Sequence, residues 1–208
     1  MLDLLSVAPI GRSELLSALG GTRLRDGAPL YAAAALALEP AVDPDALAPA
    51  QRYVLAPGVE KVLELRAALL AEGVDLFALD GGVWVETSEH PGERIPVLPP
   101  VVEESVERDG RTVLVVADGL HRVYAARSIG ARIAVVTVRD VPPEHPYYAY
   151  ALDGGWADVR ALAELPDGFQ KKEYRRPESY KSLFRDFNAV FPGVQRQRRR
   201  TNPASLVA

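Results

Sequence analysis

The sequence has 208 residues, of which 48% are hydrophobic and 25% charged, and its net charge is −4. This composition is typical of a soluble globular protein with a single core and extensions. The absence of cysteine excludes disulfides, thiol chemistry and cysteine-bound metal, and favours a cytoplasmic location. No apolar run approaches the roughly 18 residues that cross a bilayer, and the N-terminus has no basic region typical of a secretory signal. Three histidines are too few to favour a multi-histidine metal centre.

Residues 1–90 are expected to form a small mixed α/β extension. A short helix at Ser13–Leu19 should end at Gly20-Gly21. Apolar residues at helical spacing after Pro57-Gly58 predict a longer helix that ends at Gly73. Alternation and turn residues predict further strands in this part of the chain, at Leu30–Leu38, at Arg52–Leu55, and in a hairpin of Asp75–Leu79 with Val83–Thr87 around Asp80-Gly81-Gly82.

Residues 91–150 form the second predicted unit, and its first part is rich in glutamate. A strand begins at Ile95–Leu98 and is stopped by Pro99-Pro100. Glu103, Glu104 and Glu107 follow, in a segment that fits either a short helix or an irregular excursion. Runs of charge are usually solvated, which makes a surface role the first interpretation. The alternative is that Glu103 or Glu104 faces a functional site across the fold.

The stretch Val113–Gly130 is the most informative part of the sequence. Its β-branched and aliphatic residues end at Asp118-Gly119, and a helix-like segment begins at once with His121 and Arg122 in its first turn. Free N–H groups and the positive end of the helix dipole make such a junction an anion site. The other interpretation is an ordinary strand–turn–helix junction whose polar residues cap the helix and face water.

This pattern resembles the ParB/sulfiredoxin-type fold. The strand, the Asp-Gly-x-His-Arg motif, the helix that ends at Gly130 and the strand Arg132–Val138 carry the resemblance, which extends from Arg94 to Val141. It implies a nucleotide site at the helix start. It also implies an α+β fold with a mixed sheet, in which the core carries α-rich extensions at both ends.

The departures from the motif separate the branches of this family. Sulfiredoxins have a cysteine immediately before the His-Arg pair, where this chain has Leu120. ParB partition proteins have Gly-Glu-Arg-Arg, which would align with residues 119–122, and the glutamate and first arginine are missing here. The small-molecule kinase branch, which includes free-serine kinases, has Asp-Gly-His-His-Arg, and only Leu120 departs from it.

The kinase-like resemblance implies nucleotide-dependent phosphoryl transfer to a small hydroxylated metabolite such as an amino acid. ATP or ADP and Mg²⁺ would be the cofactors. Asp118 and His121 would be catalytic, with Asp118 as base or magnesium ligand, and Glu104 is our candidate for the upstream glutamate that this branch uses as general base. The residues implied to bind the nucleotide are Gly119, Leu120, His121 and Arg122. A glycine-rich Walker loop is absent, which excludes an ordinary P-loop kinase.

Residues 151–208 are expected to form a helical extension with a basic tail. Helices are predicted at Trp156–Leu165 and from Pro177, the second with one apolar face made by Tyr180, Leu183, Phe184, Phe187 and Phe191. The tail Gln195–Arg200 and the basic residues Lys171 and Lys172 have three interpretations: a solvated surface, neutralisation of a polyphosphate, or contact with nucleic acid. The clustered rings of Tyr147, Tyr148 and Tyr150 either wall a ligand pocket or pack internally.

Two other functions remain open. One is a ParB-like regulator that binds nucleotide or nucleic acid without kinase activity. The other is a fold with an inactive site, whose aromatic C-terminal segment docks on a partner. We expect no membrane partner.

Overall fold

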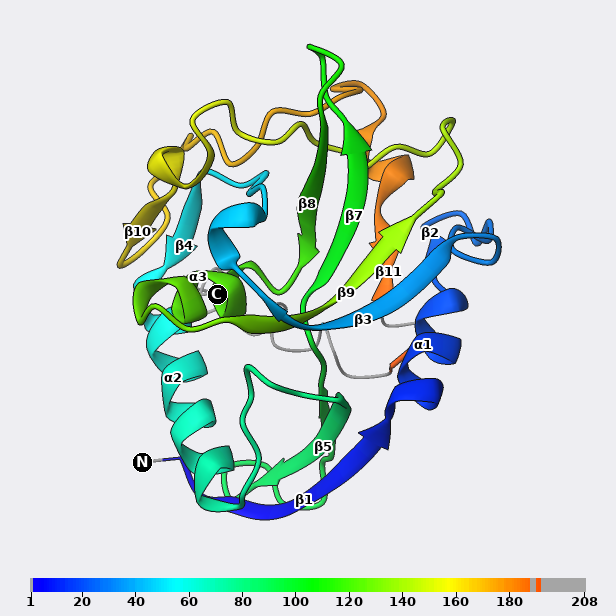
Figure 1. Cartoon of the computed structure of the whole chain (residues 1–208). Helices are drawn as coiled ribbons and strands as arrows, with labels where there is room; N and C mark the ends of the chain where they lie inside the picture. The colour runs from blue at the N-terminus through cyan, green and yellow to red at the C-terminus, as the bar shows by residue number, and fades with distance from the viewer. Residues whose placement is uncertain (1, 188–189, 192–208) are drawn as a thin grey trace, which may run out of the picture.

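A four-stranded mixed sheet lies at the centre of the structure (Figure 1). The computed structural model describes residues 2–187 and 190–191. The strand order is β3-β9-β7-β8; β7 runs parallel to β9, and the other neighbours are antiparallel. The strands are β3 (Ala35–Val42), β7 (Val101–Val106), β8 (Thr112–Asp118) and β9 (Ile133–Arg139). The mixed sheet with its helices confirms the predicted α+β class.

Both faces of this sheet are covered at β9, which explains why this strand is apolar from Ile133 to Val138 except for Thr137. Residues 133–138 of β9 are all buried, as expected of a strand packed on both sides. On one face, Ile133 and Val135 pack in a core with residues of α2 (Ala56–Ala71) and α3 (Leu120–Ser128). On the other face, Val136 and Val138 pack with α1 (Arg12–Gly20) and with aromatic residues from the C-terminal segment.

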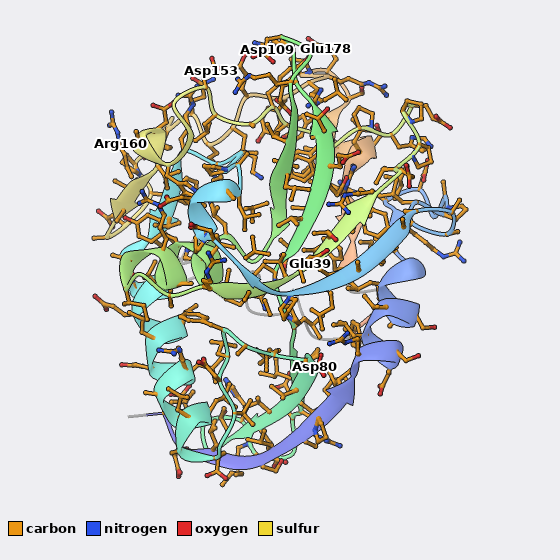
Figure 2. The ribbon with its side chains drawn as sticks, in the orientation of Figure 1. Glu39, Asp80, Asp109, Asp153, Arg160 and Glu178 are labelled. Carbon is orange, nitrogen blue, oxygen red and sulfur yellow. The ribbon has the colours of Figure 1, made fainter. Side chains whose placement is uncertain are left out.

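Three smaller sheets surround the centre. An antiparallel sheet has the order β1 (Leu4–Gly11), β5 (Gly81–Thr87), β6 (Ile95–Val97), and side chains fill the space between it and the central sheet (Figure 2). The short β4 (Tyr53–Leu55) pairs in parallel with β10 (Arg160–Leu162). Likewise β2 (Arg23–Leu24) pairs antiparallel with β11 (Arg185–Asp186), so the C-terminal segment is attached to the beginning of the chain.

The remaining helical elements are single 3₁₀ turns. They are η1 (Pro44–Ala46), η2 (Gly155–Asp158) and η3 (Tyr180–Leu183). The helices α1 and α2 and the one-turn η1 lie where local sequence signals are strong: Pro57 occupies the start of α2, and the Asp43 side chain accepts the N–H of Asp45 at η1. Within the described part of the chain, no helix has the length and apolar character needed to cross a bilayer.

Two predictions for the first half of the chain are wrong. Residues 75–79 form a turn instead of a strand, and β5 pairs with β1 and β6 instead of closing a hairpin. Glu103 and Glu104 lie on strand β7, which is between β8 and β9, and Glu107 follows its end. In each place one partner strand is distant in the sequence, β1 for β5 and β9 for β7, and local periodicity does not report such a pairing.

The two predicted C-terminal helices are also wrong. Trp156–Leu165 contains η2 and β10, and the segment after Pro177 contains η3 and β11, so the described part of this extension is not α-rich. Three residues of the predicted apolar face, Leu183, Phe187 and Phe191, are nevertheless buried. The apolar residues were therefore identified correctly, and only the backbone conformation that buries them differs.

Candidate functional site

The β8–α3 junction has the backbone geometry that the sequence motif predicts. Strand β8 ends at Asp118, and Gly119 adopts a left-handed conformation with φ 84° before the nine-residue helix α3 begins at Leu120. The carbonyl of Gly119 accepts the N–H groups of Arg122 (2.9 Å) and Val123 (3.1 Å). Because glycine has no side chain, this N-cap residue supplies no side-chain oxygen to the first N–H groups of the helix.

Asp118 and Arg122 form an ion pair across the first turn of α3. Arg122 Nη2 lies 2.9 Å from Asp118 Oδ2, and Nη1 of the same guanidinium donates to the carbonyl of Leu98. The two side chains are only 18% and 21% exposed. The arginine is thus directed inward over Gly119, where a Cβ would lie 2.7 Å from Nη2. An anion at the helix start would compete with Asp118 for this guanidinium.

The side chain of His121 joins the starts of two helices. Its Nε2 accepts the N–H of Leu55, at a distance of 3.0 Å, immediately before the first residue of α2. An imidazole that accepts through Nε2 carries its proton on Nδ1 when neutral. Any proton that His121 donates to a ligand in this state must therefore come from Nδ1.

Of the other predicted site residues, Gly119 lies against Arg122 and Leu120 begins α3, whereas Glu104 lies apart. Leu120 is half-buried and packs against the core. Glu104 lies on β7 opposite Leu114, and its carboxylate is 3.5 Å from Arg139. Asp118, in contrast, pairs in register with Val101, at the other end of β7. The structure therefore brings Asp118 and Arg122 together and does not bring Glu104 to them.

Glu103 faces the side of the sheet opposite to Glu104 and is the centre of a buried charged cluster. Its carboxylate is 1% exposed, accepts from Arg185 Nε (2.6 Å) and Nη2 (2.7 Å), and accepts from the Tyr31 hydroxyl (2.6 Å). Burial, together with the negative charge of Glu103, raises the pKa of Tyr31 well above its usual value. Burial lowers the pKa of Arg185, but Glu103 more than offsets this and raises it. The cluster is structural in character, because all three side chains are enclosed.

Asp118 contributes the carboxylate of the candidate metal site at the junction. Among the residues that the structure describes, no group of three or more His, Asp or Glu side chains is arranged to hold a metal ion. Magnesium is often bound through one or two carboxylates together with substrate phosphates. Asp118 fits that limited requirement, provided that its contact with Arg122 loosens.

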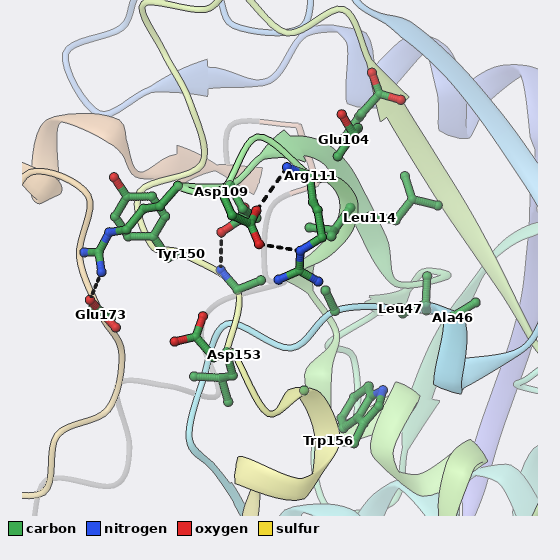
Figure 3. Close-up of a pocket in the computed structure, with 18 of the residues that line it drawn as sticks. Ala46, Leu47, Glu104, Asp109, Arg111, Leu114, Tyr150, Asp153, Trp156 and Glu173 are labelled. Carbon is green, nitrogen blue, oxygen red and sulfur yellow. Dashed lines mark hydrogen bonds and ion pairs between the residues drawn. The ribbon is translucent and has the colours of Figure 1, made fainter.

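Two cavities in the described part of the chain lie away from the junction. One of about 550 Å³ is formed at the hairpin between β7 and β8 (Figure 3). A smaller one of about 160 Å³ lies beside Arg127. Neither is lined by Asp118, Gly119 or His121, whereas Glu104 lines the larger one. The predicted site and the larger cavity are therefore distinct.

The basic segment 171–176 is mostly used within the fold. Lys172 donates to the hydroxyls of Tyr147 (3.0 Å) and Tyr148 (2.7 Å), and Arg175 pairs with Glu107 (2.6 Å). Tyr147 is buried, which supports internal packing for that ring. The basic tail Gln195–Arg200 lies outside the described residues.

The sequence model of one protein family, the ParB CE domain, matches residues 22–160, more than half of the chain. The chain belongs to the ParB CE domain family. No curated protein matches it. Among solved structures, protein Atu1540 from Agrobacterium tumefaciens is similar at 20% identity and a TM-score of 0.28. That similarity covers 51% of this chain and 39% of the Agrobacterium protein.

The ParB CE domain match includes both features described above. Residues 22–160 contain the whole central sheet, α2, α3, the β8–α3 junction and most of the lining of the hairpin cavity. The family assignment confirms the ParB-like part of the predicted resemblance. It does not distinguish the kinase-like branch.

Proposed function

We propose that this ParB CE domain protein binds a nucleotide through its phosphates at the β8–α3 junction. The observation that carries the proposal is Gly119, which turns the chain in a left-handed conformation directly into the first turn of a nine-residue helix. Such a turn directs backbone N–H groups and the positive helix end towards the same point, where they attract phosphate. The guanidinium of Arg122, beside Gly119, adds a charge suited to phosphate oxygens.

In this proposal the Asp118–Arg122 ion pair is exchanged when the nucleotide binds. The pair lies at the helix start, and its atoms are 2.9 Å apart. A phosphate carries more charge than a carboxylate and would draw the guanidinium away from Asp118. Asp118 would then be available to a nucleotide-bound Mg²⁺, which would neutralise phosphate charge.

A second candidate is phosphoryl transfer from ATP or ADP to a small hydroxylated metabolite. The position of Asp118 at the strand end, next to the proposed phosphate site, favours it over transfer that relies on Glu104. In this function Asp118 holds Mg²⁺ or accepts the proton of the attacking hydroxyl, and His121 orients the acceptor through Nδ1. Without turnover, the protein is instead a ParB-like nucleotide-binding regulator, and a cytoplasmic location suits either function.

Calorimetric titration with ATP, ADP, GTP and CTP, each with and without Mg²⁺, tests the proposal. We expect at least one nucleotide to bind, and Arg122→Lys to weaken binding about tenfold or more, because lysine lacks the planar fork. Arg127→Lys is the matched control: it changes an exposed arginine in the last turn of the same helix. Absence of binding by every nucleotide, or equal losses in both variants, would overturn the proposal.

The two candidate functions are separated by turnover. The protein is incubated with the bound nucleotide, Mg²⁺ and a panel of amino acids, sugars and alcohols, and phosphorylated products are measured. Turnover that Asp118→Asn abolishes while nucleotide binding persists supports the kinase. Binding without turnover supports the regulator, and salt-dependent DNA affinity that is lost on deleting the residues after Gly193 would add nucleic acid to its partners.

A further inference from the structure

The hairpin cavity has a lining that the proposed nucleotide site does not use. Its volume of about 550 Å³ is in the usual range of small-molecule sites, roughly 300–1,000 Å³. Thr112 lines it at one end of β8, and Asp118 ends the same strand about 20 Å away, since a strand rises about 3.3 Å per residue. The cavity and the junction can therefore be altered separately.

Both signs of charge and an apolar surface meet in this cavity. Leu47, Leu114 and Trp156 supply the apolar part of the lining. Several of the charged residues form exposed ion pairs, such as Arg139 with Glu104 and Arg108 with Glu173. Exposed ion pairs contribute only about 0–1 kcal/mol each. A ligand that carries charges of its own can therefore replace such contacts at little cost.

Arg111 presents an unused edge of its guanidinium on the cavity wall. It donates through Nε to Asp109, and its two terminal amino groups make no hydrogen bond to any residue of the described ranges 2–187 and 190–191. The paired terminal amino groups of arginine bind carboxylates in a bidentate manner. This edge therefore suits a carboxylate ligand.

Asp153 provides the opposite charge on the neighbouring wall. Its exposed carboxylate has no hydrogen bond or ion pair with another side chain in the described part of the protein. Asp109, and to a smaller extent Asp153 and Glu107, raise the pKa of Arg111. Asp109 and Asp153 lie at the same end of the molecule (Figure 2), and Arg111, Asp153 and Trp156 border the cavity together (Figure 3).

We propose that the hairpin cavity binds a small zwitterion, of the free α-amino acid or short peptide class. Arg111 binds its carboxylate, Asp153 binds its ammonium group, and an apolar side chain packs against Leu114 and Trp156. A ligand with a single charge can still enter this cavity, but only a ligand with both charges can pair with Arg111 and Asp153 at the same time. The inference is independent of nucleotide binding at the junction.

Calorimetry with the twenty L-amino acids and their glycyl dipeptides tests this site. For the tightest ligand, two single-charge analogues with the same side chain are compared: the amine without the carboxylate, and the acid without the ammonium group. We expect each analogue to bind about tenfold more weakly or worse. We expect the same loss of zwitterion binding in Arg111→Lys, which removes the fork but keeps the charge, and in Asp153→Asn.

Matched substitutions outside the cavity are the controls. Arg25→Lys and Asp167→Asn change exposed residues that do not line it. Both variants should bind the zwitterion as the unaltered protein does. The proposal is overturned if no zwitterion binds at millimolar concentration, if either analogue binds equally well, or if the cavity variants bind normally. A failure of nucleotide binding at the junction, with normal zwitterion binding, does not contradict the zwitterion proposal.

Discussion

The imidazole of His121 packs directly on Gly58 in the first turn of α2. A Cβ at position 58 would lie 2.7 Å from Cδ2 and 2.9 Å from Nε2 of that ring. The same Nε2 accepts the N–H of Leu55. The start of α3 is therefore held against the start of α2 by a contact that only glycine allows at position 58.

Gly58→Ala should destabilise the protein although alanine is the better helix former. The gain in helix propensity is about 1 kcal/mol, whereas crowding of a packed side chain costs typically about 1–3 kcal/mol. In a His121→Ala background the crowding is gone, and Gly58→Ala should then stabilise by up to about 1 kcal/mol. Urea unfolding of the four proteins of this cycle measures both effects. Stabilisation by Gly58→Ala in the presence of His121 would contradict the contact.

Gly119→Ala should be more damaging than Gly130→Ala. Both glycines are left-handed, with φ 84° and 65°, so both substitutions carry a backbone cost of roughly 1–2 kcal/mol. At Gly119 the new Cβ would also lie 2.7 Å from Arg122 Nη2 and 2.9 Å from Pro100 Cβ, whereas Gly130 has nothing within 4 Å. The extra loss at position 119, measured by thermal or urea unfolding, therefore reports the packing of Arg122 and Pro100 around Gly119. Equal losses at the two sites would show that this packing is unimportant.

The elements predicted correctly are those that local signals define. Pro57 and helical spacing mark α2, and the apolar run of β9 marks a buried strand. Strand β7 was not recognised because Glu103 and Glu104 resemble a solvated segment. What allows Glu103 inside the fold is Arg185, which is 82 residues away and leaves no local trace. The spacing of the C-terminal aromatic residues does not distinguish a helix from other conformations, and aromatic side chains also favour strands.

The sequence predicted only those features of the candidate site that depend on residues close together in the chain. The turn at Gly119 and the proximity of Asp118 and Arg122 follow from adjacent residues at a strand–helix boundary. The attachment of His121 to the start of α2 depends on Gly58, which is distant in sequence. The hairpin cavity is lined by segments that are far apart in the sequence, and Asp153 and Arg111 in it belong to no motif. Such groups of residues from distant segments come together only in the folded chain, so no local sequence pattern predicts them.

Replacing Glu103 should reduce the stability of the protein much more than replacing its neighbour Glu104. Glu103→Gln leaves the buried Arg185 without its counter-charge, and breaking a buried pair from one side typically costs about 3–5 kcal/mol. The exposed neighbour Glu104 is the control, because Glu104→Gln should change stability by less than about 0.5 kcal/mol.

The same ion pair can be removed as a unit. Glu103→Leu combined with Arg185→Met should be less destabilising than either single substitution, since no isolated buried charge remains. Urea unfolding at neutral pH measures the cycle. A double variant that loses the sum of the two single losses would mean that Glu103 and Arg185 stabilise the fold independently.

Asp75 should make part of the stability dependent on pH in the acid range. Its carboxylate accepts from Arg66 Nε (2.8 Å) and Nη2 (2.9 Å) and from the N–H of Phe77 (3.0 Å). The hydrogen bonds from Arg66 outweigh burial and lower the pKa of Asp75 below its ordinary value of 3.8. A carboxyl group with a depressed pKa in the folded state stabilises the protein above its unfolded-state pKa. That stabilisation is lost as the pH falls through the folded-state pKa.

Asp75→Asn should therefore lower stability at pH 7 by about 1 kcal/mol, a modest value because the pair is partly exposed. The difference from the unaltered protein should stay constant down to about pH 5 and shrink below about pH 4, as the native carboxylate is protonated. Asp167→Asn, at an exposed position, should show no such trend. Urea unfolding at a series of pH values from neutral to acid measures the difference. A gap between the two proteins that persists unchanged at the most acid pH would show that the hydrogen bonds to Asp75 do not depend on its charge.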